Sequence, residues 1–208
     1  MIKGIVFDMD GVLVDTEGFY QRQRESFLRE RGIPFEEGRD FSGWNDQAVW
    51  EAIVPGDPAL QKSLLEEHHK YYQAHPIPFA ELANPQAKAV LSALKSKGRK
   101  TAIASSSERA AILSMMEAVG LNGLVDFVIS GMECAAFKPD PDIYRRCMMA
   151  LELRPDEVIV IEDSPVGISA ARNAGLRVFA LRPRHGEHLD QSAAIAILPE
   201  LRRVLELL

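Results

Sequence analysis

The residues of this chain best suited to catalysis are carboxylates, hydroxyls and one lysine that lie next to short apolar runs. They are Asp8 and Asp10 after the run IKGIVF, Ser105, Ser106 and Ser107 after the run TAIA, Lys138 shortly before the segment 141–153, and Glu162 and Asp163 at the end of the run VIVIED. In a parallel sheet, the carboxyl ends of the strands form the edge where ligands bind. If the apolar runs are strands of one sheet, these side chains converge on that edge.

Such a group of side chains has a specific chemistry. Carboxylates that lie close together repel one another unless a cation sits among them, and hard oxygen ligands suit Mg²⁺, which also binds substrate phosphate. Asp8 and Asp10 are two residues apart, so in extended backbone they point the same way. One can attack while the other transfers a proton, and hydroxyls with a lysine opposite can hold the oxygens of a phosphate.

Each residue taken alone also has a structural explanation. A strand-end aspartate commonly caps a helix or forms a turn, and Glu162 and Asp163 stand before Ser-Pro, which is typical of a turn. The serines at 105–107 are well placed to cap a helix at 108–119. Lys138, before a proline, can be a solvated loop charge. The four groups together, in this order and each at a strand end, favour one site over four unrelated features.

The segments that must position these residues alternate between strand and helix patterns. Strands are predicted at 2–7, 101–105, 125–130, 158–163 and 177–181, and helices at 86–97, 107–120, 141–153 and 164–175. The strands are almost continuously apolar, which is typical of a parallel sheet covered by helices on both faces. The predicted fold class is therefore α/β, with five visible strands.

Residues from about 17 to 80 have a different pattern. Apolar residues recur at helical spacing among many charges, prolines at 55, 58, 76 and 78 interrupt them, and no convincing strand is visible. This segment is predicted to be a small helical insert between the first and second strands.

The composition narrows the class of protein. With 24 basic and 30 acidic residues, 24 − 30 gives a net charge of −6, which argues against nucleic acid or an anionic membrane as a partner but leaves room for a small phosphorylated ligand. The two cysteines are too few for a disulfide scaffold, so we expect reduced thiols. No signal-peptide pattern or apolar run near ~20 residues is visible. We expect a cytoplasmic monomer.

The four motifs together resemble those of the haloacid dehalogenase-like (HAD) superfamily of phosphatases and phosphomutases. The resemblance rests on DMDGVLVDTE at 8–17, AIASSS at 102–107, Lys138 in FKPDPDIY, and IEDSPVGISAA at 161–171. The most similar subgroup is the β-phosphoglucomutase-like phosphatases. The resemblance implies a Rossmann-like core formed by residues 1–15 and 81–208 and a helical cap at 16–80.

The resemblance also implies roles for the motif residues. Asp8 would be the nucleophile that forms an aspartyl-phosphate, and Asp10 would protonate the leaving oxygen and then activate water. Mg²⁺ would be held by the carboxylates of Asp8 and Asp163 and the main-chain carbonyl of Asp10, with Glu162 nearby or acting through water. Phosphate would be bound by Ser105, Ser106 and Lys138. The implied partner is a small phosphorylated metabolite, with a sugar phosphate as the expected class.

Departures from the mutase pattern favour a hydrolase over the alternative, a β-phosphoglucomutase-type sugar phosphomutase. Tyr20 stands where the mutases carry a histidine, and Asp46 stands where they carry the arginine that grips a second phosphate. Arg39 is a cation that can replace that arginine. Glu17 is common in the phosphatase relatives. A non-catalytic phosphate-binding protein is disfavoured, because Asp8, Asp10 and Asp163 are all present.

Several residues of the insert can contact substrate. The candidates are Glu17, Tyr20, Trp44, His68, His69 and Lys70. Trp44 can equally be a core aromatic of the insert, and the adjacent His68 and His69 cannot both face one site on a helix.

Overall fold

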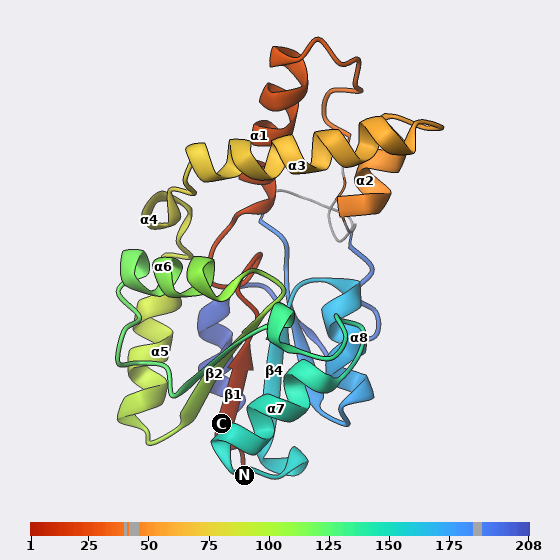
Figure 1. Cartoon of the computed structure of the whole chain (residues 1–208). Coiled ribbons are helices and arrows are strands. Elements are labelled where there is room, and N and C mark those ends of the chain that lie inside the picture. The colour runs from red at the N-terminus through yellow and green to blue at the C-terminus, as the bar shows by residue number, and fades with distance from the viewer. Residues whose placement is uncertain (40, 42–45, 185–188) are drawn as a thin grey trace. The chain divides into compact units, whose positions relative to one another are not determined.

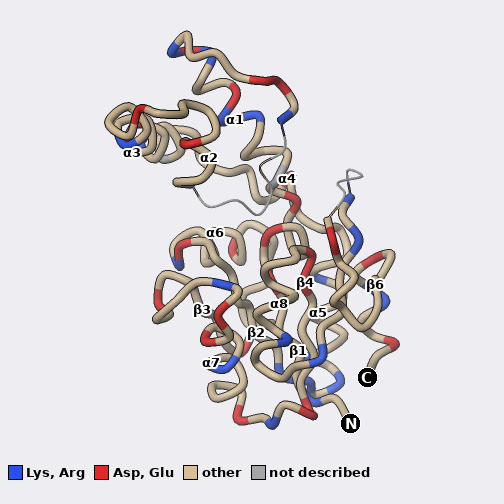
Figure 2. Tube along the Cα trace, turned by 90° about the vertical axis from the view of Figure 1, so that its right-hand side faces the viewer, with Lys and Arg blue, Asp and Glu red and all other residues tan. Residues whose placement is uncertain are grey.

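The computed structural model of the chain describes residues 1–39, 41, 46–184 and 189–208, and only the backbone of Glu17, Asp46 and Gln73. It contains two compact units. The sheet unit comprises Met1–Asp15 and Phe79–Leu208, and the helical unit comprises Thr16–Pro78. Acidic and basic positions are interspersed along the described residues of both units (Figure 2).

The sheet unit is built on a six-stranded parallel sheet with the order β3-β2-β1-β4-β5-β6. The strands are β1 (Gly4–Phe7), β2 (Lys100–Ser105), β3 (Phe127–Ser130), β4 (Val158–Glu162), β5 (Arg177–Leu181) and β6 (Ile197–Leu198). This confirms the predicted α/β fold with a Rossmann-like sheet. The five predicted strands are present, and β6 is an additional edge strand of two residues, too short to give a periodic pattern.

Helices connect and cover these strands (Figure 1). The sheet unit contains α4 (Phe79–Leu82), α5 (Ala87–Ser96), α6 (Arg109–Val119), α7 (Asp142–Leu151) and α8 (Pro165–Asn173), with short 3-10 segments η1 (Gly131–Glu133), η2 (Pro155–Glu157) and η3 (Leu201–Glu206). The four longer helices match those predicted, to within two residues at each end. The single turn α4 was not predicted.

Alternating strand residues pack against two helical layers, as a parallel sheet requires. On one face, Val6 and Val160 share a core cluster with Tyr144 and Cys147 of α7 and Ile168 of α8. The intervening strand residues face the layer formed by α5 and α6, and Figure 1 shows these two helices on the opposite side of the sheet from α7 and α8. The strand ends are therefore held rigidly by cores on both faces.

The strand register places the first and fourth motifs next to each other. Phe7, the last residue of β1, pairs with Ile103 of β2 and with Ile161 of β4. The next residue, Asp8, donates its backbone N–H to the carbonyl of Ile161 at 2.9 Å. Asp8 thus leaves the sheet beside Glu162, between the ends of β2 and β4.

The described part of the helical unit contains three helices and no strand: α1 (Glu17–Glu30), α2 (Asp46–Ile53) and α3 (Pro58–Ala74). Its core consists of Phe27, Leu28, Trp50 and Leu64. Asp57 caps α3 by accepting a hydrogen bond from the backbone of Leu60 at 3.0 Å. Among the described helices of the chain, none is long and apolar enough to span a membrane.

Candidate active site

The chain turns sharply just after β1 and carries Asp8 and Asp10 on this turn. Met9, between them, is fully buried, and the backbone N–H groups of Leu13 and Val14 donate to its carbonyl at 2.8 and 3.1 Å. Gly11 has φ +75°, and a Cβ there would lie 1.9 Å from Oδ2 of Asp163. Gly11 is therefore required both for its left-handed backbone and for the close approach of the Asp163 carboxylate.

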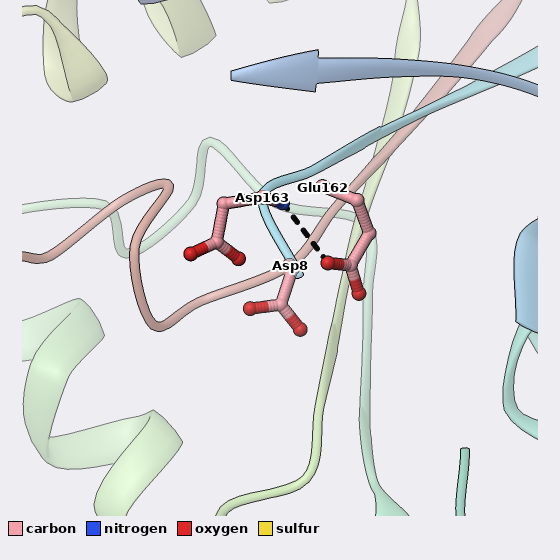
Figure 3. A group of neighbouring side chains, drawn as sticks. All are labelled: Asp8, Glu162 and Asp163. Carbon is pink, nitrogen blue, oxygen red and sulfur yellow. Dashed lines mark hydrogen bonds between the residues drawn. The ribbon is translucent and has the colours of Figure 1, made fainter. Parts of the chain in front are cut away.

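Three buried carboxylates meet at this edge of the sheet. Asp8, Glu162 and Asp163 each offer an oxygen within 4.8 Å of the others (Figure 3). All three side chains are withdrawn from solvent, with Glu162 fully buried. Such a cluster is costly unless positive charge compensates it.

Lys138 supplies part of that positive charge. Its Nζ lies 2.5 Å from Oδ1 of Asp8 and 2.7 Å from Oε1 of Glu162, and it donates to the carbonyl of Ala104 at 3.2 Å. Its side chain is only 5% exposed, so the alternative of a solvated loop charge is wrong. Burial lowers the pKa of Lys138, but the attraction of Asp8 and Glu162 outweighs it and raises the pKa well above its usual value.

For Asp8, burial outweighs the attraction of the neighbouring ammonium. Burial raises the pKa of the Asp8 carboxyl well above its usual value, with Lys138 acting in the opposite direction and the negative charges of Glu162 and Asp10 adding to the rise. The protein alone thus does not fully stabilise a charged Asp8.

Glu162 has all its oxygen lone pairs engaged by the protein. Oε1 accepts from Lys138 and, at 2.8 Å, from the hydroxyl of Tyr144, while Oε2 accepts from the backbone N–H groups of Asp163 and Ser164 and from the Ser164 hydroxyl, at 3.0 to 3.1 Å. Although burial opposes it, Lys138 lowers the pKa of Glu162, which stays charged. With about four acceptor positions on a carboxylate, Glu162 orients Lys138 and has no free position for a direct metal bond.

Asp10 is held by serines that follow β2. Its Oδ2 accepts from the Ser107 hydroxyl at 2.9 Å and from the Ser105 hydroxyl at 3.4 Å, and Ser105 also accepts from the backbone of Ser107 at 3.0 Å. Ser105 is fully buried and Ser106 is exposed. Neither Ser105 nor Ser107 caps α6, whose N-cap residue is Glu108 without a side-chain cap. The hydroxyls instead connect the first and second motifs.

A comparison with protein families fits this geometry. A family model described as haloacid dehalogenase-like hydrolase matches residues 2–175, which include every residue of the cluster. The chain belongs to the haloacid dehalogenase-like hydrolases.

Relatives of this HAD-like hydrolase include phosphatases. The phosphorylated carbohydrates phosphatase of Thermotoga maritima is 30% identical over 95% of this chain and 94% of that protein. A HAD family hydrolase of Deinococcus radiodurans, solved with phosphate and sodium, is 28% identical and covers 98% of this chain and 95% of its own, with a TM-score of 0.75. The β-phosphoglucomutase of Clostridium difficile shares the fold, with 21% identity, a TM-score of 0.76 and coverage of 98% and 93%. The HAD-like hydrolase is therefore an enzyme, a phosphomonoester hydrolase.

The carboxylate cluster of the HAD-like hydrolase fits a divalent cation. When all three are ionised, Asp8, Glu162 and Asp163 carry three negative charges, and Lys138 pairs with Asp8 and Glu162. Among these four residues, charges of −3 and +1 leave −2. The space that Gly11 leaves beside Asp163 keeps this carboxylate close to Asp8. Oxygen ligands with a double negative excess are suited to Mg²⁺.

Three positioning residues of this site were not predicted. Tyr144 binds Glu162 from α7, and its ring lies 5.1 Å from Nζ of Lys138. Asn84 donates its side-chain N–H to the carbonyl of Val12 at 2.9 Å and its backbone N–H to the carbonyl of Leu13 at 2.8 Å, which fixes the turn. Gln191 donates to the carbonyl of Asp163 at 2.7 Å and to that of Leu181 at 2.8 Å.

The sequence gives only weak signals for these three. Tyr144 lies six residues after Lys138 in the same motif, so its place near the site could have been inferred. Asn84 and Gln191 stand in irregular segments with no periodicity. Ser107 belongs to the predicted serine run, but its bond to Asp10 depends on the turn after β2.

The candidates in the helical unit are less clustered. The ring of Tyr20 packs edge-on against Phe19 and Tyr72, with centroids 6.2 and 5.7 Å apart. Glu17 and Asp46 are the first residues of α1 and α2, and Trp44 lies outside the described residues. His68 is 2% exposed inside the core of the unit, so it does not face a ligand, whereas His69 and Lys70 are exposed.

Proposed function

We propose that this hydrolase removes phosphate from a small phosphorylated carbohydrate, with Asp8 as nucleophile and Asp10 as general acid and base. The observation that carries the proposal is the meeting of Asp8, Lys138, Glu162 and Asp163 at the strand ends of a HAD-like chain. The name of the Thermotoga maritima relative supports a carbohydrate as the alcohol portion of the substrate.

The reaction has two balanced steps. In the first, an oxygen of Asp8 forms a bond to phosphorus, the ester P–O bond breaks, and Asp10 gives its proton to the leaving alkoxide. In the second, Asp10 takes a proton from water as the water oxygen bonds to phosphorus. The acyl-phosphate P–O bond then breaks, which returns the Asp8 carboxylate and releases inorganic phosphate.

The remaining motif residues bind and orient the phosphate. The ammonium of Lys138, 2.5 Å from Asp8, is close enough to stabilise the charge on the transferred group. Ser105 and Ser106 lie on the segment that leads from β2 to the Ser107–Asp10 bond, so we assign them to the non-bridging oxygens. Glu162 and Tyr144 hold the Lys138 ammonium in place.

We assign the cation to Mg²⁺, held by the carboxylates of Asp8 and Asp163 and by the main-chain carbonyl of Asp10. When bound, it would neutralise the excess charge of the cluster and polarise the phosphoryl group. Glu162 acts indirectly, since the protein engages all of its oxygens. We expect a cytoplasmic enzyme, consistent with its two free thiols, Cys134 and Cys147.

A panel of phosphate esters tests this proposal. Sugar phosphates and matched aliphatic phosphates are incubated with Mg²⁺ and the enzyme, and inorganic phosphate is measured. In parallel, β-glucose 1-phosphate with catalytic bisphosphate is followed through glucose 6-phosphate dehydrogenase. We expect phosphate release, fastest from a sugar phosphate. Efficient formation of glucose 6-phosphate without phosphate release would show the alternative, a sugar phosphomutase.

A further inference from the structure

A cavity of about 370 Å³ lies within the helical unit, among α1, the segment after it and the end of α2. Its apolar wall is formed by Leu28, Pro34, Phe35, Ala52 and Ile53. Arg24 and Arg39 also line it, together with Phe41. The lining thus combines apolar side chains with two arginines and with two glutamates, Glu25 and Glu36.

The two arginines converge on one aromatic ring. The guanidinium carbon of Arg24 lies 5.2 Å from the ring centroid of Phe41, and that of Arg39 lies 5.1 Å from the same centroid. The ring attracts both cations but neutralises neither. An anion that contacts both guanidinium groups would compensate their like charges.

Other arginines of the same unit are neutralised. Arg29 lies over Phe35 and pairs with Glu37 at 2.9 Å, and Arg31 lies over Phe27 and pairs with Glu67 at 2.8 Å. Within the described residues, Arg24 and Arg39 make no such ion pair. All four guanidinium groups lie over aromatic rings of the same unit, so the two pairs of arginines differ in their ion pairing and not in their ring contacts.

Two acids also line the cavity, but within the described residues neither makes an ion pair with Arg24 or Arg39. Glu25 accepts from the backbone of Gly38 at 2.9 Å and from the side chain of Gln21 at 3.1 Å. The Gly38 bond lowers the pKa of Glu25, and the nearby charges of Arg29 and Arg24 add to this effect. Glu36 is exposed and, in the described part of the chain, pairs with neither arginine.

We propose that this cavity binds a small organic anion, whose phosphate or carboxylate group is held by Arg24 and Arg39 and whose apolar part packs on Leu28 and Ile53. Guanidinium groups suit such oxyanions because their planar N–H groups can donate two parallel hydrogen bonds. The inference concerns binding alone and does not depend on the proposed hydrolysis.

The test is a nuclear magnetic resonance titration of the full chain at constant ionic strength, with sodium chloride as reference. The probes are inorganic phosphate and succinate, and the signals are the Nε–H groups of the arginines. We expect saturable shifts at Arg24 and Arg39 at millimolar concentration or below. Arg24→Gln and Arg39→Gln should each weaken binding about tenfold or more, the loss of one charge-assisted bond.

Two further variants test whether anion binding depends on the charges at this cavity. Arg29→Gln removes the same charge from the same unit but from an arginine that is already paired, so binding should persist. Glu36→Gln removes a carboxylate from the cavity wall and should strengthen binding. Absence of saturable shifts, shifts equal to those with chloride, or an equal loss in Arg29→Gln would overturn the proposal.

The source of the anion is identified by adding glucose 6-phosphate to the Asp8→Asn protein, which cannot turn it over. The signal of Arg24 and the backbone signal of Ser106 are followed separately. If their midpoints differ, the cavity takes a separate ligand. Shifts at Ser106 alone would contradict the cavity site while leaving the proposed function intact. Shifts at Arg24 alone would support the cavity site and would exclude glucose 6-phosphate as the substrate.

Discussion

Gly167 shows how closely single residues are fitted to the active site. A Cβ at this position would lie 1.6 Å from Oε1 of Glu162, the oxygen that holds Lys138. The first turn of α8 can therefore approach Glu162 only without a side chain. Gly11 does the same for Asp163.

The Gly167→Ala variant should lose both stability and activity. Overpacking against a buried, hydrogen-bonded carboxylate should cost at least about 2 kcal/mol, and displacement of Glu162 should misplace Lys138. Unfolding in urea and phosphate release measure the two effects. The matched control is Gly18→Ala in α1, where a Cβ meets only a flexible arginine atom at 3.2 Å, so the same change should not destabilise. Equal effects of the two variants would contradict this reading of α8.

Helix α3 carries a buried histidine that behaves as an aromatic core residue. His68 packs against Phe27 and Trp50, with centroids 5.0 Å away in each case, and against Tyr72 at 4.1 Å. Both of its ring nitrogens are buried, and neither has a hydrogen-bond partner among the described residues. Burial lowers the pKa of His68 from 6.5 to about 3.

This histidine should make the helical unit acid-sensitive. Because the folded imidazole stays neutral, the unfolded chain binds more protons between pH 6.5 and about 3, and stability falls as the pH is lowered through this window. The slope is about 1.4 kcal/mol per pH unit, or about 2 kcal/mol between pH 6.5 and 5. His68→Phe should remove this pH dependence of stability, whereas His69→Phe, at an exposed position, should retain it.

Tryptophan fluorescence measures this effect, because both tryptophans of the chain, Trp44 and Trp50, belong to the helical unit. Urea unfolding is followed at pH 7 and pH 5 in the parent and the two variants. If the free energy of unfolding of His68→Phe falls between pH 7 and pH 5 as much as that of the parent, other groups cause the acid sensitivity.

The elements were predictable from sequence where they were long and regular. Continuous apolar runs predicted β1 to β5, and the longer helices followed from 3.6-residue periodicity. The edge strand β6 and the single turn α4 are too short to carry a period. The helical pattern of α3 predicted the helix but not which of His68 and His69 faces the core.

The sequence predicted which side chains meet at the sheet edge, but not how they pair. Asp8, Asp10, Lys138 and the two acids at the end of β4, Glu162 and Asp163, share one sheet edge because parallel strands end together. Lys138, Tyr144 and the start of α8 together donate hydrogen bonds to both oxygens of Glu162. This arrangement depends on tertiary packing, which no local pattern encodes.

At the scale of the whole molecule, the buried charge of the cluster links metal binding to stability. The excess of −2 among Asp8, Glu162, Asp163 and Lys138 should destabilise the folded chain until a divalent cation compensates it. Mg²⁺ should therefore raise the midpoint of thermal unfolding, and EDTA should lower it and abolish phosphate release. Asp163→Asn should lose most of the thermal response. Full activity in excess chelator would contradict the metal assignment.

The central claim, covalent catalysis by Asp8, is tested most directly with the Asp10→Asn variant and p-nitrophenyl phosphate. The p-nitrophenolate of this ester leaves without needing a proton, so Asp8 should still be phosphorylated. Water is no longer activated, because the variant lacks the carboxylate of Asp10. We predict a burst of p-nitrophenol of one equivalent per enzyme, followed by slow turnover, and mass spectrometry should find one phosphoryl group on the peptide that contains Asp8. Asp8→Asn should show neither burst nor adduct. Wild-type turnover by Asp8→Asn, or a burst with the phosphoryl group on another residue, would contradict the account.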